Sequence, residues 1–217
     1  MPSPLQPALF LDRDGVIIEN REGYVRSPAE ARFLPGAREA LTRLAQTNAL
    51  IVIVTNQSAI GRGLITRAQA DLVNDHVLEQ IRAGGGRVDG LYLCPHHPAD
   101  NCRCRKPAPG LLLDAARDLA IDLRASVMAG DAVTDVQAAL AAGVEPVFVL
   151  SGRETLAGLR AAGYDQVATF PGLALVADWF TTRTKTPPES GGTKRRSQSP
   201  LTKPESSLRG AKRRSNP

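Results

Sequence analysis

The 217 residues carry a formal net charge of +5, and 42% of them are hydrophobic but only 4% aromatic. This composition predicts one domain with an aliphatic core, and no apolar run is long enough to indicate a membrane span. The charge is uneven, because the segment from Arg183 onward has ten basic and two acidic residues, which leaves residues 1–182 mildly acidic. The basic isoelectric point is therefore no evidence for a nucleic-acid-binding core.

The first predicted strand, 8–11, is a continuous apolar run that leads directly into Asp12-Arg13-Asp14-Gly15. Such a run is typical of a buried parallel strand, and open α/β sheets carry their chemistry just beyond the carboxyl ends of strands. Because alternate residues of an extended chain point the same way, the side chains of Asp12 and Asp14 could converge on one site. Paired carboxylates fit metal-assisted phosphate chemistry, because their oxygens can bind Mg²⁺. One carboxylate can attack phosphorus as a nucleophile, and the other can donate and later remove a proton. The alternative is a turn with solvated acids.

Strands and helices alternate along the rest of the chain, which is typical of an α/β fold with a parallel sheet. In chain order we predict a helix over 37–46, a strand over 50–54, a helix over 66–83, a strand over 88–93, a helix over 111–120, a strand over 126–129, a helix over 136–142, a strand over 146–150, a helix over 152–162, an edge strand over 166–170 and a helix over 173–180. The segment 17–32 is a long loop of the kind that often serves a site.

Polar residues follow the second strand and the fourth. Thr55 and Asn56 end the strand at 50–54, at the same sheet edge as Asp12, where hydroxyl and N–H groups could bind phosphate oxygens. Ordinary turn chemistry remains the alternative for these two residues. Asp131 follows the strand at 126–129 and is the natural third oxygen ligand for a cation. Asp135, one helical turn later, is expected to orient its neighbours or to cap the helix.

All three cysteines lie in one short window together with two histidines: Cys94, His96, His97, Cys102 and Cys104. Three cysteines and one histidine can form a closed tetrahedral zinc site of the structural type, with His97 as the weaker imidazole candidate. The alternative is three incidental free cysteines. An odd cysteine count without a recognisable secretory signal argues against a disulfide framework. The cytoplasm is therefore the predicted location.

Two adjacent cations, Arg105 and Lys106, come directly after the last cysteine. A lysine can offset charge on a transferring phosphoryl group, and an arginine can grip phosphate or sugar oxygens with its fork of donors. The alternative for this pair is a solvated surface position.

The composition changes at the carboxyl end of the chain, where Pro, Ser, Thr, Gly, Lys and Arg dominate residues 183–217. Such a segment buries too little surface to offset the entropy of ordering, so we predict one domain at 1–182 and a disordered basic tail at 183–217. The runs at 194–196 and 212–214 could contact nucleic acid or anionic lipid, although charge runs of this kind are more often solvated.

The order of these motifs resembles that of the haloacid dehalogenase superfamily: Asp-x-Asp-Gly-Val, a strand ending in Thr-Asn, Arg-Lys-Pro, and Gly-Asp-x-x-x-Asp. The segment Phe10–Val16 and the cysteine loop resemble more specifically the D-glycero-D-manno-heptose 1,7-bisphosphate 7-phosphatase family, whose sister is the histidinol-phosphate phosphatase domain. The resemblance covers about residues 8–150.

The resemblance implies a three-layer α/β/α sandwich with a parallel, Rossmann-like sheet, a zinc-stapled loop and no large cap domain. It implies that Asp12 is the nucleophile, and that Asp14 protonates the leaving sugar oxygen and then activates water. Mg²⁺ would be held by the Asp12 carboxylate, the Asp14 main-chain carbonyl and Asp131. The expected substrate is a phosphorylated sugar in lipopolysaccharide or surface-glycan precursor synthesis, and the protein would be a monomer.

The resemblance also assigns the remaining candidates. Thr55 and Lys106 would hold phosphoryl oxygens, and Asn56 and Arg105 would face phosphate or sugar. The zinc ligands would be Cys94, His96, Cys102 and Cys104. The chain departs from the family pattern at Ala132, where relatives commonly have a basic residue, which puts one supporting contact in doubt. Two rival functions are a histidinol-phosphate or broader small-molecule phosphatase, and a zinc-loop protein that binds nucleic acid through its tail.

Overall fold

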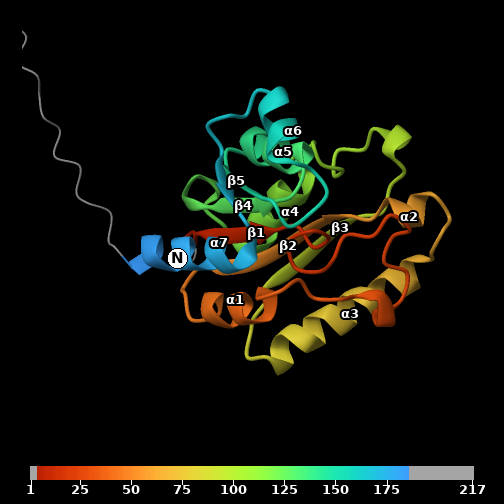
Figure 1. Ribbon diagram of the computed structural model, residues 1–217, viewed down its shortest axis with the longest axis horizontal. Helices are drawn as coiled ribbons and strands as arrows, with labels where there is room; N and C mark the ends of the chain where they lie inside the picture. The colour runs from red at the N-terminus through yellow and green to blue at the C-terminus, as the bar shows by residue number, and fades with distance from the viewer. Residues whose placement is uncertain (1–3, 186–217) are drawn as a thin grey trace, which may run out of the picture. The chain divides into compact units, whose positions relative to one another are not determined.

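A parallel sheet of six strands forms the centre of the computed structural model, which describes residues 4–185 (Figure 1). Neighbouring strands all run in the same direction, in the order β3-β2-β1-β4-β5-β6. The strands are β1 (Ala8–Leu11), β2 (Leu50–Asn56), β3 (Gly90–Cys94), β4 (Val127–Gly130), β5 (Glu145–Val149) and β6 (Ala168–Phe170). The predicted parallel sheet is confirmed.

Helices connect these strands. The α-helices are α1 (Ala37–Leu44), α2 (Ser58–Gly61), α3 (Arg67–Ala83), α4 (Gly110–Leu119), α5 (Val133–Ala142), α6 (Leu156–Ala161) and α7 (Leu173–Lys185). Short 3-10 helices lie at η1 (Pro28–Glu30), η2 (Pro98–Asp100) and η3 (Leu123–Ala125). None of the helices that the structure describes combines the length and the apolar character that crossing a bilayer requires.

Every predicted strand and helix is present, with ends shifted by a few residues. Helix α2 was not predicted, because four residues are too few to show helical periodicity. Helix α7 continues to Lys185, so the first three residues of the predicted tail, 183–185, are helical. The remainder of that tail, with both basic runs, lies outside the described residues.

The sheet lies between two layers of helices (Figure 1). Helices α1, α3 and α7 pack on one face, and α4, α5 and α6 pack on the other. The alternation of strand side chains produces this arrangement, since Leu9 and Leu11 of β1 face the first layer while Ala8 and Phe10 face the second. The three-layer sandwich is confirmed, and within residues 4–185 no separate cap domain covers the sheet.

The direction in which strands are added reverses at β1. The chain proceeds from β1 outward through β2 to β3, then returns to β4 on the other side of β1 and continues to β6. A crevice forms outside the carboxyl ends of the strands at such a switch point. Asp12 follows β1 and Asp131 follows β4, and these two strands pair with Leu11 opposite Ala129. The topology therefore brings two acidic strand ends together.

Candidate active site

Three carboxylates meet at the switch point. Asp12, Asp131 and Asp135 each offer an oxygen atom within 4.8 Å of the others, and all three side chains are buried. The Asp12 N–H donates to the carbonyl of Ala129, which fixes the end of β1 against β4. Asp131 Oδ1 is buried and has no hydrogen-bond partner in the described part of the chain. Because buried carboxylate oxygens need a donor or a cation, this donor set fits a hard divalent ion.

Two glycines allow the backbone to approach the Asp131 carboxylate. A Cβ atom at Gly15 or at Gly152 would overlap the carboxyl group of Asp131. Gly15 also has a φ of +86°, which side-chain-bearing residues rarely adopt. The loop after β1 and the loop after β5 can therefore both close on Asp131, and the amide of Arg153 donates to its Oδ2 at 2.7 Å.

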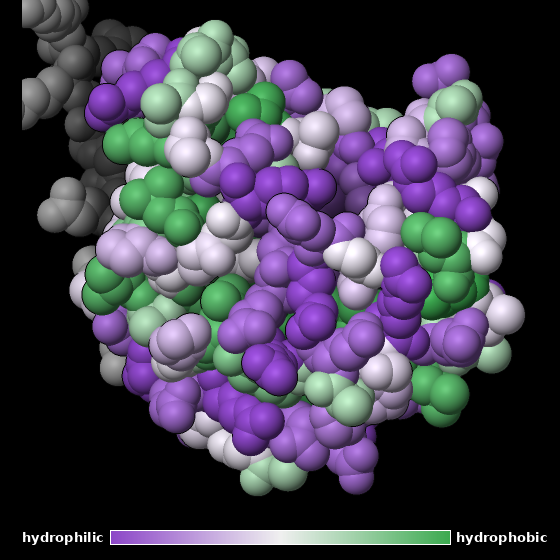
Figure 2. Space-filling model, turned by 45° about the vertical axis from the view of Figure 1, so that its right-hand side comes forward, coloured by the Kyte–Doolittle hydropathy of each residue, from purple (hydrophilic) through white to green (hydrophobic). Residues whose placement is uncertain are grey.

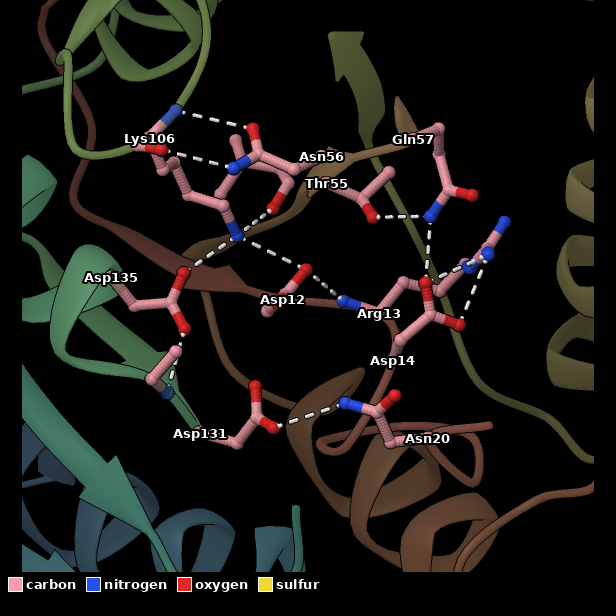
Figure 3. A network of polar contacts seen from close by, with 12 residues as sticks. Asp12, Arg13, Asp14, Asn20, Thr55, Asn56, Gln57, Lys106, Asp131 and Asp135 are labelled. Atoms are coloured by element: carbon pink, nitrogen blue, oxygen red, sulfur yellow. Dashed lines mark hydrogen bonds and ion pairs between the residues drawn. The ribbon is translucent and has the colours of Figure 1, made fainter. Parts of the chain in front are cut away.

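Lys106 is a buried cation between Asp12 and Asp135 (Figure 3). Its Nζ lies 3.1 Å from Asp12 Oδ1 and 2.6 Å from Asp135 Oδ1, and it donates to the Val54 carbonyl. Burial alone would lower the pKa of Lys106, but the charges of Asp12 and Asp135 outweigh it and raise that pKa above its ordinary value. The lysine therefore stays charged at neutral pH, beside the proposed phosphoryl acceptor.

Asn56 holds the segment that carries Lys106. Its Nδ2 donates to the Lys106 carbonyl and its Oδ1 accepts from the Lys106 amide, both at 3.1 Å. Asn56 also lines the cleft at this edge. Sequence reasoning assigned it to phosphate or sugar, and the structure adds that both polar atoms of its amide already bind the lysine backbone.

Burial raises the pKa of the Asp12 carboxyl to about 7, with Lys106 opposing and the neighbouring carboxylates reinforcing the shift. The folded, metal-free protein therefore holds a proton on Asp12 at pH values where an unfolded Asp, with a pKa of 3.8, has lost it. Because stability falls with pH wherever the folded state binds more protons, this group makes the metal-free protein less stable as the pH rises.

We accordingly expect the free energy of unfolding in a chelator to fall between pH 3.8 and about 7 because of Asp12. Other acids titrate in the same range, so the measurement is the difference between the wild-type protein and Asp12→Asn in urea unfolding. That difference should shift in favour of the variant as the pH rises. A difference that does not change with pH would contradict the burial of an ionisable Asp12.

Asp14 lines the same cleft as Asp12, but its side chain lies outside the cluster of three carboxylates. Its two oxygens accept hydrogen bonds from Arg13 at 3.0 and 2.9 Å, and Gln57 Nε2 donates to its Oδ2 at 2.6 Å. Figure 3 shows Asp14 turned toward these two donors, whereas Asp12 faces Lys106. Asp135 takes the third carboxylate position instead. Side-chain donors on neighbouring segments, rather than strand alternation, decide where Asp14 points.

Thr55 is buried and does not line the cleft. Its Oγ1 accepts a hydrogen bond from Gln57 Nε2 at 2.9 Å. A hydroxyl can accept and donate at the same time, so this contact leaves the Thr55 hydroxyl proton available to another acceptor.

The predicted zinc ligands lie together beyond β3. The shortest contacts are 3.2 Å between His96 Nδ1 and Cys104 Sγ, and 3.5–3.6 Å from Cys94 Sγ to His96 and Cys102 and from Cys102 Sγ to Cys104. The usual zinc–ligand lengths give a tetrahedral site edges of about 3.5–3.8 Å. Three of these four separations lie in that range, and the one between His96 and Cys104 is shorter. Burial raises the pKa of the Cys94 thiol to about 12, so a metal would have to displace its proton.

His97 is not part of this group. Its Nδ1 accepts from the Ala99 amide at 3.1 Å, and its own N–H donates to Asp100. This pairing caps η2, and it explains why His96 rather than His97 faces the cysteines.

A cleft of about 560 Å³ lies in front of the carboxylates. Five basic and five acidic residues line it: Arg21, Arg62, Arg105, Lys106 and Arg153, and Asp12, Asp14, Glu22, Asp135 and Glu154. Arg105 Nη1 is buried without a partner in the described part of the chain, so this donor is available to an anion. Hydrophilic side chains also run across the middle of the face shown in Figure 2, while apolar ones gather mainly toward its edges. The cleft therefore suits a polar ligand, and Arg105 offers it a cationic donor.

Three residues that sequence reasoning did not assign also contribute to the site: Arg13, Gln57 and Asn74. Arg13 and Asn74 are buried and joined by a hydrogen bond of 2.6 Å. A signal for Asn74 was present, because it lies four residues after Ala70 and three before Val77, on the apolar face of α3. A polar residue at such a position indicates a buried polar partner.

The sheet is doubly wound, and its switch point carries a cluster of three carboxylates and a buried lysine. This arrangement is that of a HAD-like hydrolase. Residues 103–174 match the HAD-hydrolase-like family model. A relative from Bordetella bronchiseptica, named D-glycero-beta-D-manno-heptose-1,7-bisphosphate 7-phosphatase, is 42% identical over 151 residues, covering 69% of this chain and 84% of the relative. A relative of the same name from Escherichia coli K12 is 41% identical, covering 68% and 81%. The chain belongs to this phosphatase family.

Solved structures agree. The crystal structure of D,D-heptose 1,7-bisphosphate phosphatase from B. bronchiseptica, in complex with magnesium and phosphate, is similar with a TM-score of 0.77 and 36% identity, covering 82% of this chain and 99% of that one. A putative HAD-like phosphatase from Mesorhizobium loti is similar with a TM-score of 0.64 and 32% identity, covering 78% and 90%.

Proposed function

We propose that the chain is a Mg²⁺-dependent phosphatase that removes the 7-phosphate of D-glycero-β-D-manno-heptose 1,7-bisphosphate through an aspartyl-phosphate on Asp12. The names of the relatives support the substrate. The observation that carries the chemistry is the position of Asp12, which belongs to the carboxylate group and pairs with Lys106. The pathway would be lipopolysaccharide or surface-glycan precursor synthesis.

In the first step Asp12 attacks phosphorus, the bond between phosphorus and the sugar oxygen breaks, and Asp14 gives a proton to that oxygen. In the second step a water attacks the phosphorus of the aspartyl-phosphate and Asp14 takes the water proton. The bond between phosphorus and the Asp12 oxygen breaks, which releases inorganic phosphate and restores the Asp12 carboxylate. Lys106 and Thr55 hold the phosphoryl oxygens, and Arg105 and Asn56 face phosphate or sugar. The cationic groups offset negative charge that develops on phosphorus.

Mg²⁺ would be held by the carboxylates of Asp12 and Asp131 and by the main-chain carbonyl of Asp14. Bound there, it would neutralise charge on the phosphoryl group and orient it. Asp135 serves in this proposal to hold Lys106, because its Oδ1 faces Nζ and its Oδ2 accepts from the Ala132 amide. The buried, unpartnered Asp131 Oδ1 is the support for a cation at this point.

Zn²⁺ would be bound by the four clustered side chains, Cys94, His96, Cys102 and Cys104. With no ligand position left open, the ion would stabilise the loop and do no chemistry. Free thiolate ligands fit a reducing compartment, so the proposal includes the cytoplasm, and the protein is proposed to act as a monomer.

A substrate panel tests this assignment. We expect kcat/KM for the heptose bisphosphate to exceed that for histidinol phosphate and for simple hexose phosphates by at least about 10²-fold, because arginines that line the cleft besides Lys106 can engage a second phosphate. Equal values across the panel would remove the substrate assignment and leave only the phosphatase chemistry. A preference for histidinol phosphate would instead favour the sister activity.

A further inference from the structure

A buried arginine sits between the nucleophile and the proposed acid–base residue. Arg13 is only 1% exposed and is one of the largest fully buried side chains in the described part of the chain. Its Nη2 donates to both oxygens of Asp14, and its Nη1 donates to Asn74 Oδ1 at 2.6 Å. A guanidinium cannot lose its proton, so once buried it has to keep these partners.

The far end of this network lies on a different element. Asn74 is in α3, packed on the face of the sheet opposite to α4, and is 3% exposed. Its Nδ2 has no hydrogen-bond partner among the described residues, so Arg13 is the only described group that its side chain binds. The buried face of α3 thus fixes the guanidinium, and the guanidinium fixes Asp14.

The Asp14 side chain is fixed by hydrogen bonds and still accessible from the cleft. Three N–H donations from Arg13 and Gln57 reach its two oxygens, yet its side chain remains 23% exposed and lines the cleft. A carboxyl group that must give a proton to a leaving oxygen benefits from such a fixed geometry, because the ordering entropy is lost on folding rather than during the reaction.

We propose that Arg13 and Asn74 are positioning residues that hold Asp14 where it protonates the leaving oxygen. Neither residue is proposed to touch the substrate; both act through Asp14. The inference rests on the acid–base role proposed for Asp14 above. A positioning role can be distinguished from a merely structural one, because general-acid catalysis matters only when the leaving group is poor.

The test compares two substrates in the first turnover, by rapid quench on the full chain with Mg²⁺. Heptose bisphosphate releases a poorly leaving sugar alkoxide, whereas p-nitrophenyl phosphate releases a phenolate that needs no acid. Asn74→Leu removes the acceptor for Arg13 at similar volume. We expect it to slow release from the sugar phosphate at least about 10-fold and from p-nitrophenyl phosphate less than about 3-fold, with KM nearly unchanged.

Three variants complete the design. Asn74→Asp keeps an oxygen acceptor and should restore release from the sugar phosphate to within about 3-fold of wild type. Ser126→Ala is the matched control, since Ser126 is buried, its Oγ accepts from the Ala8 amide, and it lies at the opposite end of β1. It should change both substrates by the same small factor. If Asn74→Leu does not fold, Asn74→Ala takes its place.

Equal losses on the two substrates in the Asn74 variant would overturn the inference. Asp14→Asn serves as the reference and should show the same bias toward the sugar phosphate, with a loss of about 10²–10⁴-fold. If Asp14→Asn shows no such bias, the role proposed for Asp14 fails and the inference fails with it. If only the Asn74 variants lack the bias, the proposed function stands and the inference alone is wrong.

Discussion

Asp12→Asn is expected to lower kcat by at least about 10⁴-fold, because an amide nitrogen or oxygen does not attack phosphorus as a carboxylate does. The loss should appear at saturating substrate and saturating Mg²⁺, since Asp12 is proposed to act as nucleophile and not only as a ligand. Steady-state phosphate release on the heptose bisphosphate measures it.

The matched control for this variant is Asp71→Asn. Asp71 lies on α3 in an exposed ion pair with Arg67 and does not line the cleft. Its loss should therefore leave kcat within about 2-fold of the wild-type value. Circular dichroism should show both variants folded. An Asp12→Asn protein that keeps a tenth or more of wild-type kcat would rule out Asp12 as the nucleophile.

The second large effect concerns the cysteine loop. Replacing Cys102 and Cys104 together by serine should remove zinc from the purified protein and lower its free energy of unfolding by at least about 3 kcal/mol, because structural zinc contributes directly to folding. Activity should fall as well. Lys106 comes two residues after Cys104, at one end of the loop. At the other end, the main-chain N–H of Gln57 donates to the Cys94 carbonyl at 2.8 Å, so the loop supports the site at both ends.

His97→Asn is the control for the zinc variant, because His97 lies in the same loop but caps η2 and does not face the cysteines. It should retain one zinc per chain by metal analysis. Zinc retained in the double cysteine variant, or absent from both variants and from the wild-type protein, would contradict the proposed ligand set.

Much of the site follows from the positions at which strands end. The carboxyl ends of parallel strands share one edge of a sheet, so Asp12, Thr55 and Asp131 could be placed together from the apolar runs that precede them. The clustering of every cysteine in one window likewise predicts that the proposed zinc ligands lie together. These are consequences of local pattern, which the fold does not override.

The orientation of Asp14 could not be obtained in this manner. Strand alternation places Asp12 and Asp14 at one cleft, which the structure bears out, but the direction of the Asp14 carboxyl group is set by Gln57 and Arg13. Arg13 is held in turn by Asn74 in α3. Such contacts join residues far apart in the sequence, and no local pattern specifies which donor reaches which oxygen.

The surroundings of Ala132, which departs from the family pattern, also depend on residues far away in the sequence. The segment after β5 lies against the start of α5 there, with Glu154 Oε2 accepting from the Val133 amide at 2.8 Å and the Arg153 side chain lining the cleft. Acceptors for the first N–H groups of α5 thus come from Glu154 and from Asp135 in the helix itself. Arg153 lines the same cleft as Ala132, so the segment after β5 brings a cation to this cleft.

The covalent intermediate is the most direct test of the account. Wild-type protein mixed with heptose bisphosphate and Mg²⁺ should be quenched in acid within the first turnover and analysed by peptide mass spectrometry. The account predicts the added mass of one phosphoryl group on Asp12, and none in Asp12→Asn or in a chelator. A wild-type protein that releases phosphate while Asp12 stays unmodified, or while another residue carries the phosphoryl group, would contradict it.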